Sequence, residues 1–199
     1  MSASDHLDRL ADALDRRVRT EQIRVLYAQA PLGALAGLLI APLLVFAVWE
    51  ALPRAPLLVW LLALEATILV RLGLTLAFHR RSDPAETESW AARYRWACAA
   101  SGACWGGCAL LLALSPSAVY ETFIALMLGG VLMGGVFTLS AVFGTYLLYA
   151  LLLGLPPTLW LLAQSDPMRV VMGVCGLLYV ALALTTAWRL HETLRHSLR

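Results

Sequence analysis

Two charged residues, Glu65 and Arg71, lie inside the otherwise apolar stretch that runs from Leu57 to Phe78. A charge in hydrocarbon costs from about 3 to more than about 10 kcal/mol, so such residues usually mark a polar site. If the stretch is helical, the two side chains point about 240° apart and lie about 9 Å apart along the axis. They cannot form an i, i+4 pair, and each needs water or a partner on another helix.

Three interpretations of this pair remain open. Glu65 and Arg71 can each make a structural hydrogen bond between helices, line a polar ligand pocket or signalling switch, or belong to a proton or ion path. We therefore treat them as a candidate intramembrane polar site.

The cysteines and histidines are the other side chains that could hold a cofactor. A thiolate metal site needs three or four converging N or S ligands, and no histidine lies mid-span beside Cys98, Cys104, Cys108 and Cys175. We expect these cysteines to be small buried residues. His79 and His191 lie at span ends and could serve as haem ligands, although histidines are also common at membrane interfaces. The sequence predicts no metal and no other cofactor.

Signals for catalysis are absent from the sequence. It has no Gly-rich phosphate loop, serine nucleophile elbow or HExxH zinc motif. Its aromatic and basic residues do not gather into a surface for nucleic acid, and its net charge is only +2. We expect neither an enzyme nor a nucleic-acid-binding protein.

Composition indicates an integral membrane protein. The 199 residues are 60% hydrophobic and 14% charged, with a mean hydropathy of +0.74, whereas about a quarter of the residues of a soluble domain are charged. A bilayer needs roughly twenty apolar residues per helix. Six such spans follow one another, at 31–52, 56–78, 96–114, 119–140, 143–163 and 168–188. The predicted fold is an all-α polytopic membrane helix bundle with six transmembrane helices.

The distribution of arginine predicts the orientation of the bundle. The positive-inside rule places the arginine-rich connections in the cytoplasm. Only Arg54 and Arg169 lie on one side of the predicted spans, whereas twelve lie on the other: Arg9, Arg16, Arg17, Arg19, Arg24, Arg80, Arg81, Arg93, Arg95, Arg189, Arg195 and Arg199. Both termini are therefore expected in the cytoplasm. The outward connections are too short to fold into a binding domain, so a ligand must be met within the bundle, at its rim or in the lipid.

Glycines and prolines occur at particular positions within the predicted spans. Gly102 with Gly106, and Gly130 with Gly134, repeat every four residues, a spacing that lets helices approach closely in lipid. We expect these four glycines to pack the third and fourth spans together, with a homodimer face or the movable part of a switch as alternatives. Kinks or breaks are expected at Pro42 and at the pair Pro156–Pro157.

Both ends of the chain have helical patterns outside the spans. Residues 1–30 are expected to form an amphipathic juxtamembrane helix, on the spacing of Leu7, Leu10, Leu14 and Val18. This helix would lie at the lipid interface, pack on the bundle or pair in a dimer. The last span continues into a polar exit helix over 189–199, where Leu190, Leu194 and Leu198 repeat every four residues. Such a helix could transmit a shift to a cytoplasmic domain, or it could be a frayed tail.

Four segments carry a resemblance to a known family: "VLYAQAPLGALAGLL", "AFHRR", "SGACWG" and "RLHETLRHSLR". In this order, the chain resembles the six-span N-terminal membrane module that precedes diguanylate cyclase, cyclic-di-GMP phosphodiesterase, PAS or histidine kinase domains in bacterial signalling proteins. The resemblance implies a sensory input role in the bacterial inner membrane and a homodimer formed through the exit helix. It supplies no ligand residues. This sequence departs from the pattern by stopping at Arg199, so we expect either a sensor fragment or a stand-alone protein that signals through a partner.

The sequence therefore predicts a sensory or regulatory input module with a transmembrane domain over 31–188. It would detect a small or lipophilic ligand, or the state of the bilayer, and relay the signal to a cytoplasmic output domain or partner protein. The rival predictions are a small transporter or channel, and a structural subunit of a larger membrane complex.

Overall fold

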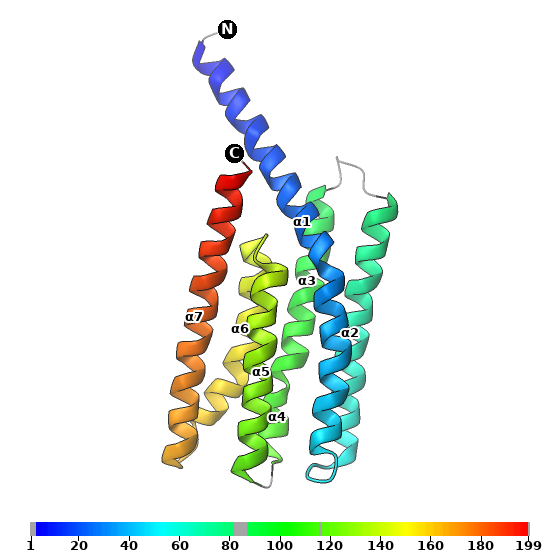
Figure 1. Cartoon of the computed structure of the whole chain (residues 1–199), viewed down its shortest axis with the longest axis vertical. Helices are drawn as coiled ribbons and strands as arrows, with labels where there is room; N and C mark the ends of the chain where they lie inside the picture. Colours follow the sequence, from blue (N-terminus) through cyan, green and yellow to red (C-terminus); the bar gives the residue numbers. More distant parts are fainter. Residues whose placement is uncertain (1–2, 82–86, 116, 199) are drawn as a thin grey trace.

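The computed structural model describes residues 3–81, 87–115 and 117–198, and the side chains of 3–13, 15, 16 and 81 are left aside. All regular structure in these residues is helical: α1 (Ala3–Val48), α2 (Arg54–Arg81), α3 (Thr87–Gly106), α4 (Cys108–Ala113), α5 (Ala118–Leu139), α6 (Phe143–Leu162) and α7 (Pro167–Ser197). The helices run up and down in one bundle, and both ends of the chain lie at the same end of it (Figure 1).

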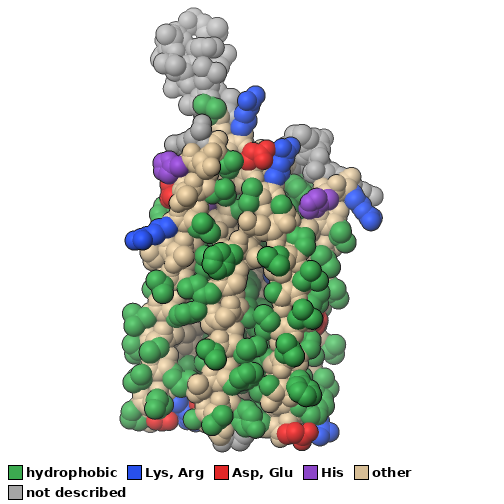
Figure 2. All heavy atoms as spheres, viewed as in Figure 1, with side chains coloured by type: hydrophobic (Ala, Val, Ile, Leu, Met, Phe, Trp, Pro, Cys, Tyr) green, Lys and Arg blue, Asp and Glu red, His purple; other side chains and the backbone are tan. Residues whose placement is uncertain are grey.

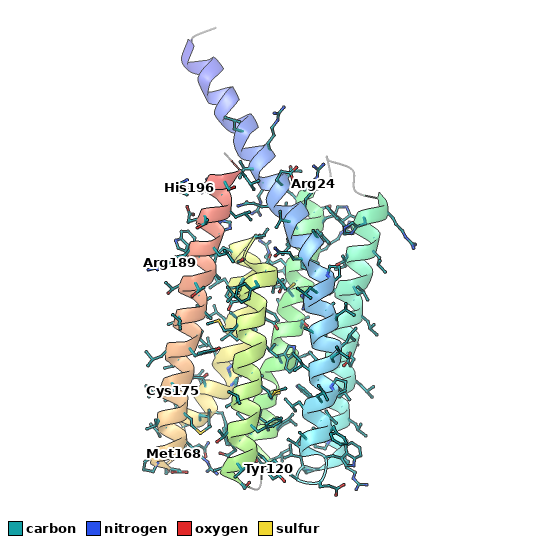
Figure 3. The ribbon with its side chains drawn as sticks, viewed as in Figure 1. Arg24, Tyr120, Met168, Cys175, Arg189 and His196 are labelled. Carbon is teal, nitrogen blue, oxygen red and sulfur yellow. The ribbon has the colours of Figure 1, made fainter. Side chains whose placement is uncertain are left out.

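Six helical segments are long and apolar enough to cross a membrane, as the sequence predicts: Arg17–Val48, Arg54–Arg80, Thr87–Ala113, Ala118–Leu139, Phe143–Leu162 and Pro167–Ser197. Hydrophobic side chains cover the middle of the visible face, and charged side chains gather towards its two ends (Figure 2). Arg24, Arg189 and His196 lie towards the end that holds the termini, whereas Tyr120 and Met168 lie at the other (Figure 3). This distribution is the one that a bilayer around the bundle requires.

The predicted boundaries at residues 30 and 189 fall inside helices. α1 is continuous across the first boundary and passes through Pro31 and Pro42, and α7 crosses the second. The N-terminal part of α1 leans away from the course of its later part (Figure 1). Val18 is buried and Leu14 is exposed, while the side chains of Leu7 and Leu10 lie outside the described part of the chain.

The connection between the second and third spans is shorter than the charged sequence suggests, because α3 begins at Thr87. An aromatic cluster holds this polar end of α3 to its neighbours. The Tyr27 hydroxyl donates to the Trp90 carbonyl oxygen at 2.9 Å, and the Tyr27 and Phe78 rings stack with centroids 3.9 Å apart. Arg19 adds a salt bridge to Glu88 at 3.0 Å. These contacts join α1, α2 and α3 at the end that holds the termini.

The third span is interrupted at Gly107, between α3 and α4. The indole N–H of Trp60, on α2, donates to the Cys104 carbonyl oxygen at 2.7 Å. In an unbroken helix that oxygen accepts from the N–H of Cys108. Here that oxygen accepts from the Trp60 indole and from the N–H of Gly107, at 3.1 Å. We attribute the interruption to this contact from another helix.

The glycines of α3 bring it against α6. A Cβ atom added at Gly102 would lie 2.6 Å from the backbone oxygen of Tyr149, and one at Gly106 would overlap the backbone oxygen of Leu152. Only glycine allows this approach. α6 also packs along α7, where Gly154 meets Val180 and Gly173 meets Leu162.

Candidate functional site

Arg71 lies in the interior of the bundle, with 5% of its surface exposed. Its guanidinium donates to the Tyr94 hydroxyl at 3.3 Å and lies 5.6 Å from the centroid of the Tyr94 ring. Its Nε has no hydrogen-bond partner. Among the residues that the structure describes, Arg71 forms no salt bridge. A cation so deeply buried would ordinarily be paired with an anion.

Arg71 lines a cavity of about 340 Å³ between α1 and α5. α1 contributes one wall and α5 the other, while α2, α3 and α6 contribute Ile68, Trp105 and Tyr149 in addition to Arg71. Leu32 and Phe137, which also line the cavity, are 69% and 67% exposed. The cavity therefore opens sideways between α1 and α5, on the face that Figure 2 shows.

The two glycine pairs named in the sequence have different surroundings. Gly102 and Gly106 are buried against α6, whereas a Cβ atom added at Gly130 or Gly134 would have no heavy atom within 4 Å. Both of the latter line the Arg71 cavity. The close partner of α3 is thus α6, and the α5 pair leaves space.

Glu65 does not share this site with Arg71. It is half-buried, it does not line the cavity, and its Oε1 is shielded without a hydrogen-bond partner in the described structure. Thr67 faces α3, where its hydroxyl donates to Ser101 at 3.2 Å. The two residues of the predicted polar site are therefore apart, and Arg71 lines the cavity between α1 and α5 whereas Glu65 does not.

A short series of contacts leads from the cavity to the exit helix. Thr138 and Leu139, near the end of α5, line the cavity. The turn that follows them contains Ala141, whose carbonyl oxygen lies 3.1 Å from Nδ1 of His191 on α7. That oxygen can only accept, so the histidine ring donates.

Aromatic rings reinforce the contact between this turn and α7. Phe143, at the start of α6, meets Trp188 edge to face with ring centroids 5.0 Å apart. Leu190 is 39% exposed, Leu194 packs partly against the core and Leu198 ends the helix. The exit helix is thus attached to the α5–α6 turn through Trp188 and His191.

Sequence reasoning missed a buried ion pair at the opposite end of the bundle. Glu121 on α5 is 1% exposed and accepts two hydrogen bonds from Arg169 on α7, both at 2.9 Å. Asp166, which caps α7 by accepting from the N–H of Met168, lies 3.9 Å from Arg169. Both residues lie near span ends, where a hydropathy pattern does not distinguish a buried charge from a solvated one.

A second cavity, of about 580 Å³, lies between α5, α6 and α7. Thr122, Pro157, Cys175 and Tyr179 are among the residues that line it, and its walls are mainly apolar. Cys98 and Cys108 are buried, Cys104 is half-buried and Cys175 is exposed (Figure 3). The expectation that all four cysteines are buried is therefore wrong for Cys175.

The two candidate haem ligands do not meet. His79 lies on α2 and bonds to the Thr75 carbonyl oxygen at 2.8 Å, while His191 lies on α7 at the other side of the bundle (Figure 1). Within the described ranges, no group of three or more His, Cys, Asp or Glu side chains is placed to hold a metal ion.

Comparisons of the chain with protein-family models, with curated proteins and with solved structures gave no match. The resemblance to bacterial sensory modules therefore stays a prediction. The geometry itself presents a buried cation without a described salt bridge at the wall of a cavity.

Proposed function

We propose that this protein is a sensory or regulatory module that binds a ligand between α1 and α5 and relays its presence through α7. The observation that carries the proposal is the cavity of about 340 Å³ with Arg71 in its wall. A buried cation without a salt-bridge partner is costly, and such costs are typical of functional sites. The proposal extends to a homodimer in the bacterial inner membrane, with both termini cytoplasmic and an output domain or partner protein receiving the signal.

The contacts at the end of the cavity support the relay. Thr138 and Leu139 line the cavity, and the Ala141 carbonyl oxygen in the next turn holds His191 on α7. A ligand that binds one arrangement of α1 and α5 more tightly than another would shift the population towards that arrangement. The attached exit helix would then shift with the turn.

A reporter fusion tests the relay. A diguanylate cyclase domain is fused directly after Arg199, and its activity is compared with that of a second fusion carrying a flexible glycine–serine insert at the junction. We expect the membrane module to control the rigid fusion and the insert to abolish that control. Equal behaviour of the two fusions would refute the relay.

A histidine pair on α7 supplies a matched control. His191→Ala removes the bond to Ala141, whereas His196 is 75% exposed and makes only a 3.9 Å contact with Glu192 of its own helix. We expect His191→Ala to weaken coupling in the rigid fusion and His196→Ala to leave it unchanged. Equal effects would argue against the turn as the point of transmission.

The rival functions give different results. A transporter or channel would produce solute flux in proteoliposomes that Arg71 variants change. A structural subunit would co-purify with a stable partner and show no dependence of the reporter on the junction.

A further inference from the structure

The geometry points to a binding site for an amphiphilic carboxylate in the cavity between α1 and α5, with Arg71 pairing with the carboxylate group. The ligand class is a monoanion with a single apolar chain of medium length. This inference deepens the proposed function and rests on it for the biological role of the site.

The charge of the site selects an anion. Arg71 is 95% buried, since 5% of its surface remains exposed, and its Nε lacks a hydrogen-bond partner. Its described polar contacts are the Tyr94 hydroxyl and the Cys98 thiol. A neutral hydroxyl and a neutral thiol leave the positive charge unbalanced. An anion in the cavity would supply both the missing charge and acceptors for the guanidinium N–H groups.

Charge balance also selects the kind of anion. One arginine and one carboxylate form a neutral pair, and the planar guanidinium matches the two carboxylate oxygens. A phosphate monoester carries about −1.5 to −2 charges at pH 7. It would leave a net negative charge within apolar walls, where no second described cation lines the cavity.

The walls of the cavity fit a hydrocarbon chain. Ile40, Ile68, Val131 and Phe137 line it together with several glycines. Its volume of about 340 Å³ is near the lower end of the range for ligand pockets, roughly 300–1,000 Å³. One medium-length chain suits this space better than the two long chains of a phospholipid.

The glycines of α5 keep the site open. Gly130 and Gly134 line the cavity, and a Cβ atom at either would meet no heavy atom within 4 Å. A Cβ atom at Gly134 would therefore enter open space, and we expect a leucine there to take up part of the cavity. Gly73 on α2 has equally open surroundings but lies outside both described cavities, so it provides a matched control.

The experiment measures saturable binding of radiolabelled decanoate to the full chain in phosphatidylcholine nanodiscs, after subtraction of binding to empty nanodiscs. Unlabelled decanoate and decanol, which has the same chain without the charge, are the competitors. We expect decanol to compete at least about tenfold more weakly, because charge-assisted hydrogen bonds supply much of the affinity. Arg71→Gln and Gly134→Leu should each weaken binding by about tenfold or more, and Gly73→Leu should bind as the wild type does.

Three results would overturn the inference. Equal competition by decanol would identify an apolar groove without charge selection. Wild-type binding by both Arg71→Gln and Gly134→Leu would place the ligand elsewhere. Loss of decanoate binding when phosphatidylglycerol replaces part of the phosphatidylcholine would assign the site to a phospholipid headgroup. Because Gly134→Leu retains Arg71, failure of Arg71→Gln to fold leaves the test intact.

The decanoate binding assay and the reporter fusion test the ligand site and the relay separately. Arg71-dependent decanoate binding without any change in the rigid reporter fusion would support this inference and remove the proposed relay. A reporter controlled through α7 but with no decanoate binding would keep the relay and refute the carboxylate site.

Discussion

Two arginines on the helices of this bundle have opposite surroundings. Arg169 meets the buried Glu121 with two hydrogen bonds of 2.9 Å, whereas Arg71 has no described salt bridge and lines a cavity. A paired buried charge holds its two helices in a defined arrangement, while an unpaired one leaves binding capacity unused. The presence of an arginine in a membrane span is thus not enough to assign a role, because its partner decides between a structural contact and a site.

Helix α5 takes part in both arrangements. At one end, Glu121 attaches it to α7, and further along, Gly130 and Gly134 keep a space between it and α1. The helix is therefore tied to α7 by an ion pair at one end, whereas part of its length borders the Arg71 cavity on the side of α1. This asymmetry is what a ligand entering between α1 and α5 could use.

The largest expected effect contrasts close-packed and open glycines. Gly106→Ala should lower the free energy of unfolding by about 3 kcal/mol or more, because its Cβ would overlap the Leu152 backbone oxygen. Gly134→Ala should raise it by about 0.5–1 kcal/mol, because alanine favours the helix and the added atom meets nothing. Unfolding equilibria in mixed micelles measure both, and changes of the same sign would contradict the contrast.

Breaking the Glu121–Arg169 pair comes next. Arg169→Met should lower the midpoint of thermal unfolding by several degrees, because it leaves the 1% exposed Glu121 without its partner. Glu121→Gln should cost less, since the Arg169 side chain is 31% exposed and can reach water. Thermal unfolding in detergent compares the variants. An unchanged midpoint in Arg169→Met would show that the pair is not structural.

Arg71→Leu should stabilise the protein, whereas Arg169→Met should destabilise it. Without a ligand, replacing an unpaired buried cation by an apolar side chain should raise the free energy of unfolding by about 1–2 kcal/mol. Arg71→Lys, which keeps the charge, should give no such gain. The same mixed-micelle equilibria measure the change, with no carboxylate added. A loss of stability as in Arg169→Met would indicate that Arg71 is a structural residue.

The smallest expected effect is that of Glu65→Gln. Glu65 is half-buried and lies outside the Arg71 cavity, so the neutral variant should change the free energy of unfolding by less than about 0.5 kcal/mol. Decanoate binding should stay at the wild-type level. A weaker affinity of Glu65→Gln for decanoate would show that Glu65 belongs to the same site as Arg71.

Much of the helical architecture could be predicted because its signals are local. Runs of apolar residues of bilayer length identified six spans, and turns rich in Pro and Ser separated them. The start of α3 at Thr87 escaped this reasoning, because polar residues of a helix that passes the membrane surface look like a loop in a hydropathy pattern. The interruption at Gly107 also escaped it, since its cause is an indole on another helix.

Only part of the candidate site could be predicted from such local signals. An arginine within an apolar span is conspicuous, so Arg71 was identified, and Glu65 was grouped with it for the same reason. Gly130 and Gly134 have the same four-residue spacing as the two glycines of α3. A Cβ atom would meet another backbone only at Gly102 and Gly106. Spacing shows that a helix face is small, but it does not show what lies opposite that face.

Local sequence patterns are enough to predict that this chain forms apolar helices of membrane length, because hydropathy and helical periodicity depend on neighbours along the chain. Which helices adjoin is visible only in the folded bundle. Folding brought Glu121 to Arg169 across 48 residues, left Arg71 facing a cavity and attached His191 to the α5–α6 turn. The physical reason is that these arrangements depend on packing between segments far apart in the chain.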